Sequence, residues 1–223
     1  MPRYTGPRLE RMLASKQYRD GAFHNPSGVR PGLNKVDDTS RLSMVGDFVF
    51  GGGKRRPPGV VPVESPLEAW SRAAQTDLRL TWLGHSTMLI ESGGLRVLTD
   101  PVFGARVSPV SFAGPKRFHR VPATIAELPK LDAVLVSHDH LDHLCAPSIR
   151  ELAALRVPFV TSLGVGYHLE KLGVDPALIT ELDWWESARV GGAVFHAVPA
   201  QHFSGRSLGD RNETLWSSWV IET

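Results

Sequence analysis

The sequence predicts an α/β domain in which helices flank mixed β-sheets. Between residues 78 and 100, short alternating segments are separated by glycines, a pattern typical of antiparallel hairpins. From residue 132 onward, apolar strand-like runs alternate with helical segments, which is typical of parallel strands. With 223 residues, of which 42% are hydrophobic, the chain is long enough to bury the core of one such domain.

Residues 1–60 differ from the rest in composition and charge. They are rich in Gly and Pro and hold 11 Lys and Arg against 5 Asp and Glu, a net charge of +6. Residues 61–223 hold 14 Lys and Arg against 18 Asp and Glu, a net charge of −4. We expect residues 1–60 to form a basic N-terminal extension, with one short helical segment near residues 9–18, and residues 61–223 to form the α/β domain. A solvated arm is the favoured interpretation of the extension, and peripheral contact with anionic lipid is the alternative.

The elements of the α/β domain can be assigned in order. A helix is expected to begin at Ser65, because Ser65 is a good N-cap, Pro66 suits the first helical position and Glu68 completes a capping box. The strand at 78–82 alternates Leu and Trp with Arg and Thr. The expected strands that follow are 87–92, 95–100, 132–138, 157–162, 179–185, 193–199 and 215–222, and the expected helices are 146–155 and 166–172.

A cluster of histidines and aspartates, "SHDHLDH" at 137–143, directly follows the apolar run "LDAVLV". In an extended segment His138 and His140 point the same way, so both can reach one ion at about 2.0–2.1 Å. Asp142 and His143 can serve a second ion, and two ions about 3.5–4 Å apart can clamp the oxygens of a displacement. Asp139 should point the other way. Four candidate ligands at a strand end favour a metal site over a merely hydrophilic loop.

Other polar residues are weaker candidates. His85 lies in a glycine-containing loop after a strand and could line the rim of a site. Arg206, four residues after His202, could present positive charge to a phosphate, although a solvated loop arginine is the default. His168 and His196 fit structural positions better. The single cysteine, Cys145, excludes an internal disulfide framework and a Cys-based zinc finger.

The composition also excludes several classes of protein. The longest apolar runs are far shorter than the about 18 residues that a membrane helix needs, and the N-terminus lacks the apolar core of a signal peptide. We therefore expect a cytoplasmic location. Nucleic-acid binding is not expected, because the basic residues of the extension are not interleaved with aromatic ones.

The motif "HDHLDH" and the earlier "TDP" at 99–101 resemble the metallo-β-lactamase superfamily. A longer chain of segments is similar to its N-acyl-phosphatidylethanolamine phospholipase D-like branch. These segments are "QYRDGAFHN", "WLGHST", "TDPVF", "SPVSFAGPKRF", "ELPKLDAVLVSHDHLDHL", "PAQHFSGR" and "TLWSSWV", which run from Gln17 to Val220. The resemblance implies the αββα fold, with residues 61–223 forming the N-terminal portion of the domain.

The resemblance also implies a set of site residues. His138, His140 and His202 would bind a first zinc, and Asp142 and His143 would begin a second zinc site, with Asp142 as the catalytic residue. Asp100 would be a carboxylate that orients a ligand histidine from behind.

The implied activity is that of a zinc-dependent hydrolase whose metal-bound hydroxide attacks a phosphodiester of an N-acyl-phosphatidylethanolamine-type phospholipid. One alternative is a lactonase-like hydrolase of a small phosphorylated metabolite. In the superfamily a bridging aspartate and a last histidine follow later than Thr223, the final residue of this sequence. We therefore expect an incomplete second site and little turnover from these residues alone. The third alternative is a truncated, non-catalytic protein that binds at most one zinc.

Overall fold

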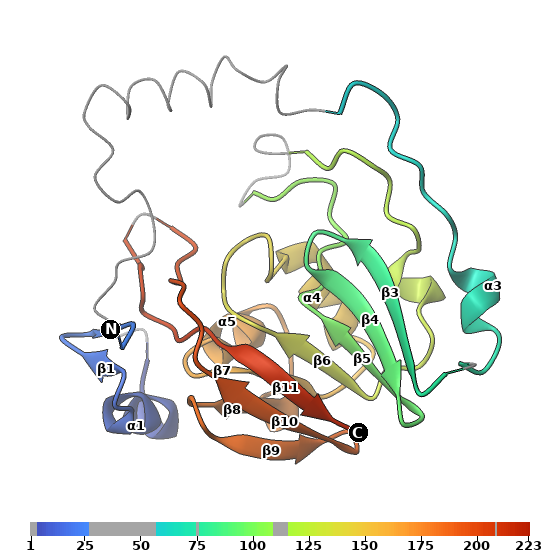
Figure 1. Cartoon of the computed structure of the whole chain (residues 1–223). Coiled ribbons are helices and arrows are strands. Elements are labelled where there is room, and N and C mark those ends of the chain that lie inside the picture. The colour runs from blue at the N-terminus through green and yellow to red at the C-terminus, as the bar shows by residue number, and fades with distance from the viewer. Residues whose placement is uncertain (1–3, 27–56, 75, 109–115, 208) are drawn as a thin grey trace.

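The computed structural model describes residues 4–26, 57–74, 76–108, 116–207 and 209–223, and in these ranges it forms two main sheets with helices packed against them (Figure 1). The helices are α1 (Gly6–Ala14), α3 (Leu67–Trp70), α4 (Ala146–Ala153), α5 (Gly166–Lys171), η1 (Ile125–Glu127) and η2 (Pro176–Leu178). The strands are β1 (Tyr18–Arg19), β2 (Ala22–Phe23), β3 (Leu78–Gly84), β4 (Thr87–Ser92), β5 (Leu95–Thr99), β6 (Ala133–Val136), β7 (Phe159–Ser162), β8 (Ile179–Leu182), β9 (Ser187–Val190), β10 (Ala193–Val198) and β11 (Ser218–Glu222).

The larger sheet is mixed and has the strand order β3-β4-β5-β6-β7-β8. β3, β4 and β5 pair antiparallel, and β4 and β5 are joined by Gly93 and Gly94, whose φ angles of 57° and 78° suit a tight hairpin turn. β5, β6, β7 and β8 are all parallel to their neighbours. This confirms the predicted mixed α/β class, with an antiparallel start and a parallel continuation.

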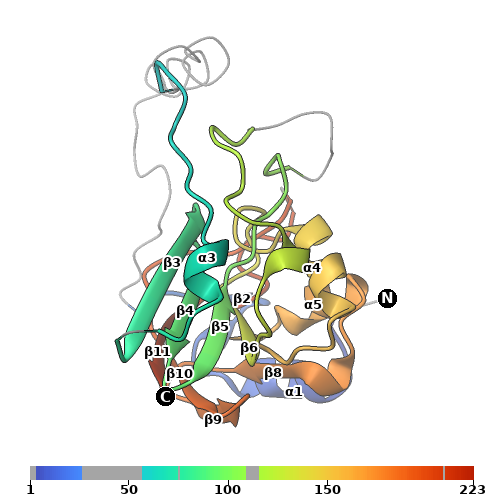
Figure 2. The ribbon, with the colours of Figure 1, turned by 90° about the vertical axis from the view of Figure 1, so that its right-hand side faces the viewer.

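The smaller sheet, β11-β10-β9, is antiparallel and packs on one face of the larger sheet, while α4 and α5 lie on the opposite face (Figure 2). Phe195 of β10 packs with Val97 and Leu135 between the two sheets. Ile149 and Leu152 of α4 pack on the other side with the remaining core. β6 is buried along its whole length because both of its faces are covered, as its unbroken apolar run predicts.

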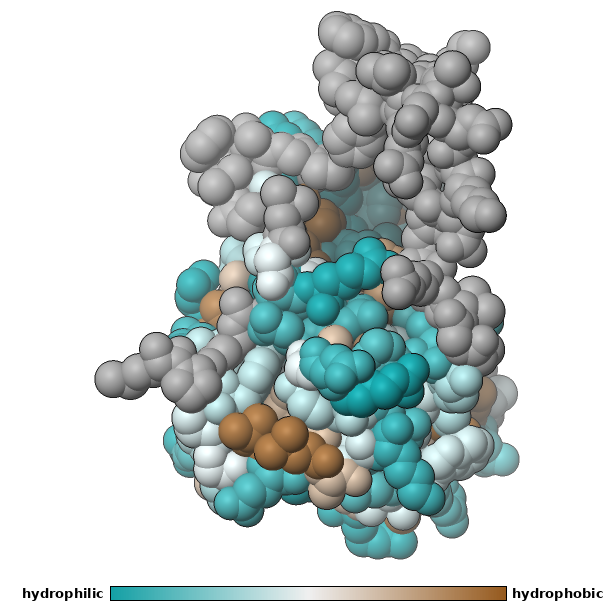
Figure 3. Space-filling view, turned by 90° about the vertical axis from the view of Figure 1, so that its left-hand side faces the viewer, coloured by the Kyte–Doolittle hydropathy of each residue, from teal (hydrophilic) through white to brown (hydrophobic). Residues whose placement is uncertain are grey.

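Residues 4–26 lie against this body. Phe23 and Met12 are fully buried in a cluster with Trp216, and Arg8 forms ion pairs with Glu170 and Glu181. The face drawn in Figure 3 is mostly hydrophilic where it is described, with a prominent apolar patch low on that face and smaller apolar areas near its edges. The rest of the expected extension, 27–56, lies outside the described residues, so the boundary at residue 60 stays a prediction.

Several predicted element bounds are wrong; the strand expected at 215–222, for example, begins at Ser218. α3 starts one residue later than expected: the first helical hydrogen bond runs from the Trp70 N–H to the Pro66 carbonyl oxygen at 2.9 Å, so the N-cap is Pro66, whose side chain has no acceptor, and not Ser65. The strand expected at 179–185 ends at Leu182, since the chain turns at Trp185, which has φ of 74° and is 76% exposed. That turn leads into β9, which the sequence reading missed.

Part of one apolar face of the larger sheet, at its edge strand β3, is exposed. Leu78, Leu80 and Trp82 of β3 share a face, as their alternation predicts, and are 52%, 52% and 60% exposed. Leu80 pairs with Ile90 of β4, which packs into the core between the two sheets. The exposed residues therefore lie on the same face as that core, beyond the part that the described strands of the smaller sheet cover.

Candidate metal centre

The predicted ligands gather where strands of both sheets end. His138 and His140 follow β6, and Asp100 follows β5, its parallel neighbour, so all three lie at the carboxyl edge of the larger sheet. His202 follows β10 of the smaller sheet. The site therefore lies at the junction of the two sheets, which brings residues separated by 64 positions into contact.

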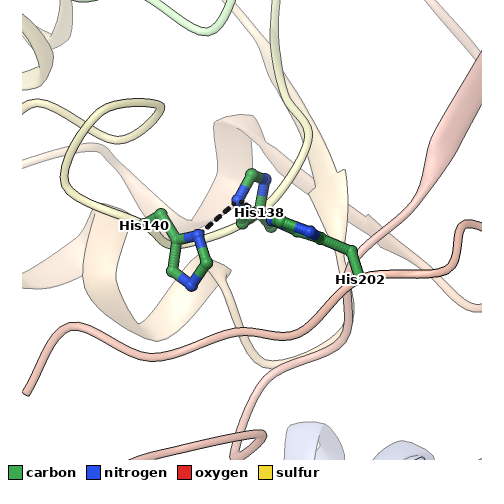
Figure 4. A group of neighbouring side chains, drawn as sticks. All are labelled: His138, His140 and His202. Atoms are coloured by element: carbon green, nitrogen blue, oxygen red, sulfur yellow. Dashed lines mark hydrogen bonds between the residues drawn. The ribbon is translucent and has the colours of Figure 1, made fainter. Parts of the chain in front are cut away.

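The first cluster consists of His138, His140 and His202 (Figure 4). His138 Nε2 lies 2.9 Å from His140 Nδ1 and 3.0 Å from His202 Nε2. One nitrogen from each ring lies within 4.8 Å of the others. Nitrogens bound to one tetrahedral zinc at about 2.0–2.1 Å are about 3.3 Å apart, so the three rings need only small shifts to share an ion.

The surroundings of this cluster keep its imidazoles neutral. Burial lowers the pKa of His138 far below its ordinary value, and the neighbouring histidines lower it further. Burial, followed by the proximity of His202, lowers the pKa of His140 to about 4, and burial also lowers the pKa of His202. Neutral rings keep the lone pairs that a metal ion needs, so the donor set fits a transition metal.

A second cluster lies beside the first and consists of His85, Asp142 and His143, again with one ligand atom of each within 4.8 Å of the others. His85 Nε2 lies 2.9 Å from Asp142 Oδ2, and the His85 ring contacts the His143 ring edge to face. His85 was expected only as a contact for substrate. Its position next to Asp142 makes it a candidate ligand or a rim residue of the same site.

Asp100 lies directly behind the second cluster. Its Oδ1 accepts a hydrogen bond from the Ser137 backbone N–H at 2.7 Å, and its Oδ2 accepts from Ser137 Oγ and His143 Nδ1, both at 2.8 Å. Burial alone would lower the pKa of His143, but the hydrogen bond and charge of Asp100 raise it. These contacts leave Nε2 of His143 free to face an ion, which is the arrangement that the orienting role of Asp100 requires.

Arg206 points into the protein rather than toward open solvent. Its guanidinium donates to the carbonyl oxygens of Asp139 at 2.6 Å and Leu144 at 2.9 Å, which lie near the two ends of the motif loop. The buried carboxylate of Asp139 accepts from the Gly205 backbone N–H at 2.7 Å. These bonds tie the motif loop to the His202 loop. They favour a structural role for Arg206 over the expected contact with substrate, and the sequence reading missed the role of Asp139.

A groove of about 530 Å³ opens next to the second cluster, with His85 and Asp142 in its wall. Trp82, Val102 and Phe118 contribute large apolar side chains to it. Its basic lining residues are Arg106, Lys116, Arg117 and His119. An apolar channel with cationic groups therefore leads to the candidate metal ligands.

Comparisons with known proteins identify the family of this chain. The family model of the beta-lactamase superfamily domain matches residues 95–223. An uncharacterised protein of Mycobacterium tuberculosis (strain ATCC 25618 / H37Rv) is 44% identical over 209 residues, 93% of this chain and 55% of that protein. The N-acyl-phosphatidylethanolamine-hydrolyzing phospholipase D 1 of Caenorhabditis elegans is 33% identical over 241 residues, 99% of this chain and 66% of that enzyme.

A more distant relative is a UPF0173 metal-dependent hydrolase of Pyrobaculum islandicum (strain DSM 4184 / JCM 9189 / GEO3), 27% identical over 146 residues, 66% of this chain and 57% of that protein. The chain spans about half the length of the curated relatives that it matches most strongly, 55% in the mycobacterial case. The match of the family model covers more than half of the described α/β body and includes every residue of the histidine motif. The chain belongs to the beta-lactamase superfamily, as its histidine motif and fold class predict.

Proposed function

We propose that this chain contributes the metal centre and substrate groove of a zinc-dependent, phospholipase D-like hydrolase that cleaves a phosphodiester of an N-acyl-phosphatidylethanolamine-type phospholipid. The observation that carries the proposal is the apolar groove that leads to Asp142 and His85. The similarity to the Caenorhabditis elegans enzyme, whose name states this activity, supports the same substrate class.

The two clusters have the donor chemistry for zinc. His138, His140 and His202 would hold a first ion, and Asp142 and His143 would hold a second, with His85 beside them. Bound zinc would supply Lewis acidity that lowers the pKa of coordinated water toward neutrality. The protein's own contribution is to orient the ligands: Asp100 holds His143, and Arg206 holds both ends of the motif loop.

The groove would bind the two parts of a phospholipid differently. Trp82, Val102 and Phe118 offer apolar surface to an acyl chain, and Arg106 and Lys116 offer positive charge to a phosphate. A small phosphorylated metabolite, the substrate of the lactonase-like alternative, would leave this apolar surface unused. The groove therefore favours the lipid. Among the described residues no helix is long and apolar enough to cross a bilayer.

Hydrolysis assays with matched variants test the proposal. The chain, loaded with zinc, is presented with N-acyl-phosphatidylethanolamine in mixed micelles and with a water-soluble phosphodiester. Trp82→Ala should lower lipid hydrolysis, because Trp82 lines the groove, whereas Leu78→Ala should not, because Leu78 is exposed on the same strand outside the groove. Equal effects of the two substitutions, or preference for the water-soluble ester, would refute the lipid assignment.

Metal analysis of the purified chain separates the enzymatic proposal from the non-catalytic alternative. Two zinc ions per chain, with loss of at least one in His140→Ala, support a complete dinuclear site. One ion or none supports the truncated, non-catalytic alternative, which binds at most one zinc.

A further inference from the structure

We infer that Asn25 is a positioning residue of the metal centre, which fixes the backbone of the ligand His202 from the N-terminal segment. The inference rests on the proposed function, because it assumes that His202 binds metal. Composition alone describes residues 4–26 as the start of a basic arm. The inference instead gives this segment a role in holding the metal centre.

The contact is a pair of hydrogen bonds to both backbone groups of one residue. Asn25 Nδ2 donates to the His202 carbonyl oxygen at 2.8 Å, and the His202 backbone N–H donates to Asn25 Oδ1 at 3.3 Å. Asn25 is buried, with 6% of its surface exposed. The buried amide of Asn25 bonds to both the N–H and the C=O of His202, as a neighbouring strand would in a sheet. It therefore restricts both the position and the rotation of the His202 backbone.

Asn25 is itself held firmly. Phe23, two residues earlier, is fully buried, and its backbone N–H donates to the Asn212 carbonyl oxygen at 2.7 Å. The His24 backbone N–H donates to the Gln17 carbonyl oxygen at 2.9 Å, which closes the hairpin of β1 and β2. The N-terminal segment therefore presents Asn25 to His202 from a fixed base.

His202 needs such support because of where it lies. It follows β10 by four residues, in a loop that returns to β11 without forming a described helix or strand. The other two histidines of the first cluster lie two and four residues after β6, and their loop is held at Ser137 by the Asp100 carboxylate. Trp216 Nε1 donates to the Ala200 carbonyl oxygen at 2.7 Å before His202, and Arg206 and Asp139 hold the loop after it. Among the described hydrogen bonds, those of Asn25 are the ones made to the His202 backbone.

Cobalt binding tests this role, because Co²⁺ in a site of three histidines gives a visible absorption band. Asn25→Ala removes both hydrogen bonds. Asn25→Asp keeps the acceptor for the His202 N–H but places a carboxylate oxygen against the His202 carbonyl. Both variants should bind Co²⁺ about 10–100-fold more weakly than the unaltered chain, the usual effect of removing a residue that orients a metal ligand.

Two controls isolate the contact. Gln17→Ala changes another amide of the N-terminal segment whose side chain is not among the described partners of His202. Val174→Ala removes buried apolar atoms outside the metal centre, so it shows how far a general loss of stability alone affects cobalt binding. Both controls should keep the cobalt affinity of the unaltered chain.

Hydrogen exchange of the metal-free chain gives a second readout. Asn25→Ala should speed amide exchange in residues 200–206 and leave residues 137–144 unchanged. Unchanged cobalt affinity together with unchanged exchange would overturn the inference. If the unaltered chain bound no Co²⁺, the proposed function would fail, and exchange alone would decide whether Asn25 holds the loop: faster exchange would support the contact and equal exchange would overturn it.

Discussion

Replacing Asp100 with asparagine tests whether this carboxylate organises the second cluster. The substitution preserves the shape of the side chain. One oxygen can still accept from the Ser137 backbone N–H, and the new amide can donate to the Ser137 hydroxyl. The bond that has no replacement is the one from His143 Nδ1, because an amide NH₂ cannot accept it.

The expected magnitude follows from that single lost bond. A hydrogen bond to a charged group contributes about 1.5–3 kcal/mol, so Asp100→Asn should lower the free energy of unfolding by about 2 kcal/mol. His143 would also lose its fixed orientation, and loss of such a partner weakens metal affinity by about 10–100-fold. At 1.4 kcal/mol per factor of ten, this weakening is a loss of about 1.4–2.8 kcal/mol in the free energy of metal binding. It is of the same size as the expected loss in the free energy of unfolding.

Urea unfolding and zinc titration with a competing chelator measure the two quantities. Asp132→Asn is the matched control. Its carboxylate also accepts from a backbone N–H, that of Arg96 at 2.8 Å, but at the opposite end of β6 from the metal centre. Because asparagine keeps an oxygen that can accept from the Arg96 N–H, the control should lose little stability and keep its zinc affinity. If Asp100→Asn bound zinc as tightly as the unaltered chain, the orienting role of Asp100 would be wrong.

Three further predictions concern charge, packing and the second cluster. Burial alone would raise the pKa of Glu91, but its hydrogen bonds, led by that from Arg79, lower it. Glu91 therefore contributes stability above its unfolded-state pKa of about 4.3 and loses it as the pH falls through the lower folded value. Glu91→Gln should cost about 1–3 kcal/mol at pH 7 in urea unfolding and much less at pH 3; an equal gap at both values would exclude the charge as the cause. Phe195→Ala, which empties the core between the sheets, should cost about 3–5 kcal/mol, whereas Val220→Ala on the outer face should change stability by less than about 0.5 kcal/mol; similar losses in thermal unfolding would contradict this packing. His85→Ala should weaken binding of the second Co²⁺ by about tenfold and leave the first unchanged in an absorption titration, and a loss at the first ion instead would place His85 in the other site.

Local pattern predicted much of the larger sheet. The glycine pair at 93 and 94 predicts the β4–β5 hairpin because only a tight turn with positive φ joins two strands that closely. The unbroken apolar run of β6 predicts burial on both faces, and the two sheet-covering layers provide it. These features depend on neighbours in the sequence, so the sequence displays them directly.

Features that depend on residues distant in the sequence could not be predicted from local pattern. The alternation at Leu78, Leu80 and Trp82 predicts that the three share a face, but burial of that face depends on how far the smaller sheet extends. The contact of Asn25 with His202 spans 177 residues, so neither "QYRDGAFHN" nor "PAQHFSGR" reveals it by itself. Trp185 interrupts an apolar run through its backbone conformation, a feature that residue types alone do not reveal.

The same dependence explains why the candidate metal centre was only partly predictable from the residues. His138, His140, Asp142 and His143 lie within six positions, so one strand end brings them together. His202 reaches them only because β10 packs on the larger sheet through Phe195 and Ala197. The distance between His202 and His138 is therefore set by the core between the sheets and by Asn25, not by the histidine motif. A metal centre built in this way couples ligand geometry to the packing of the whole body, so substitutions in the core between the sheets should alter the first cluster more than equally destabilising substitutions beneath α4.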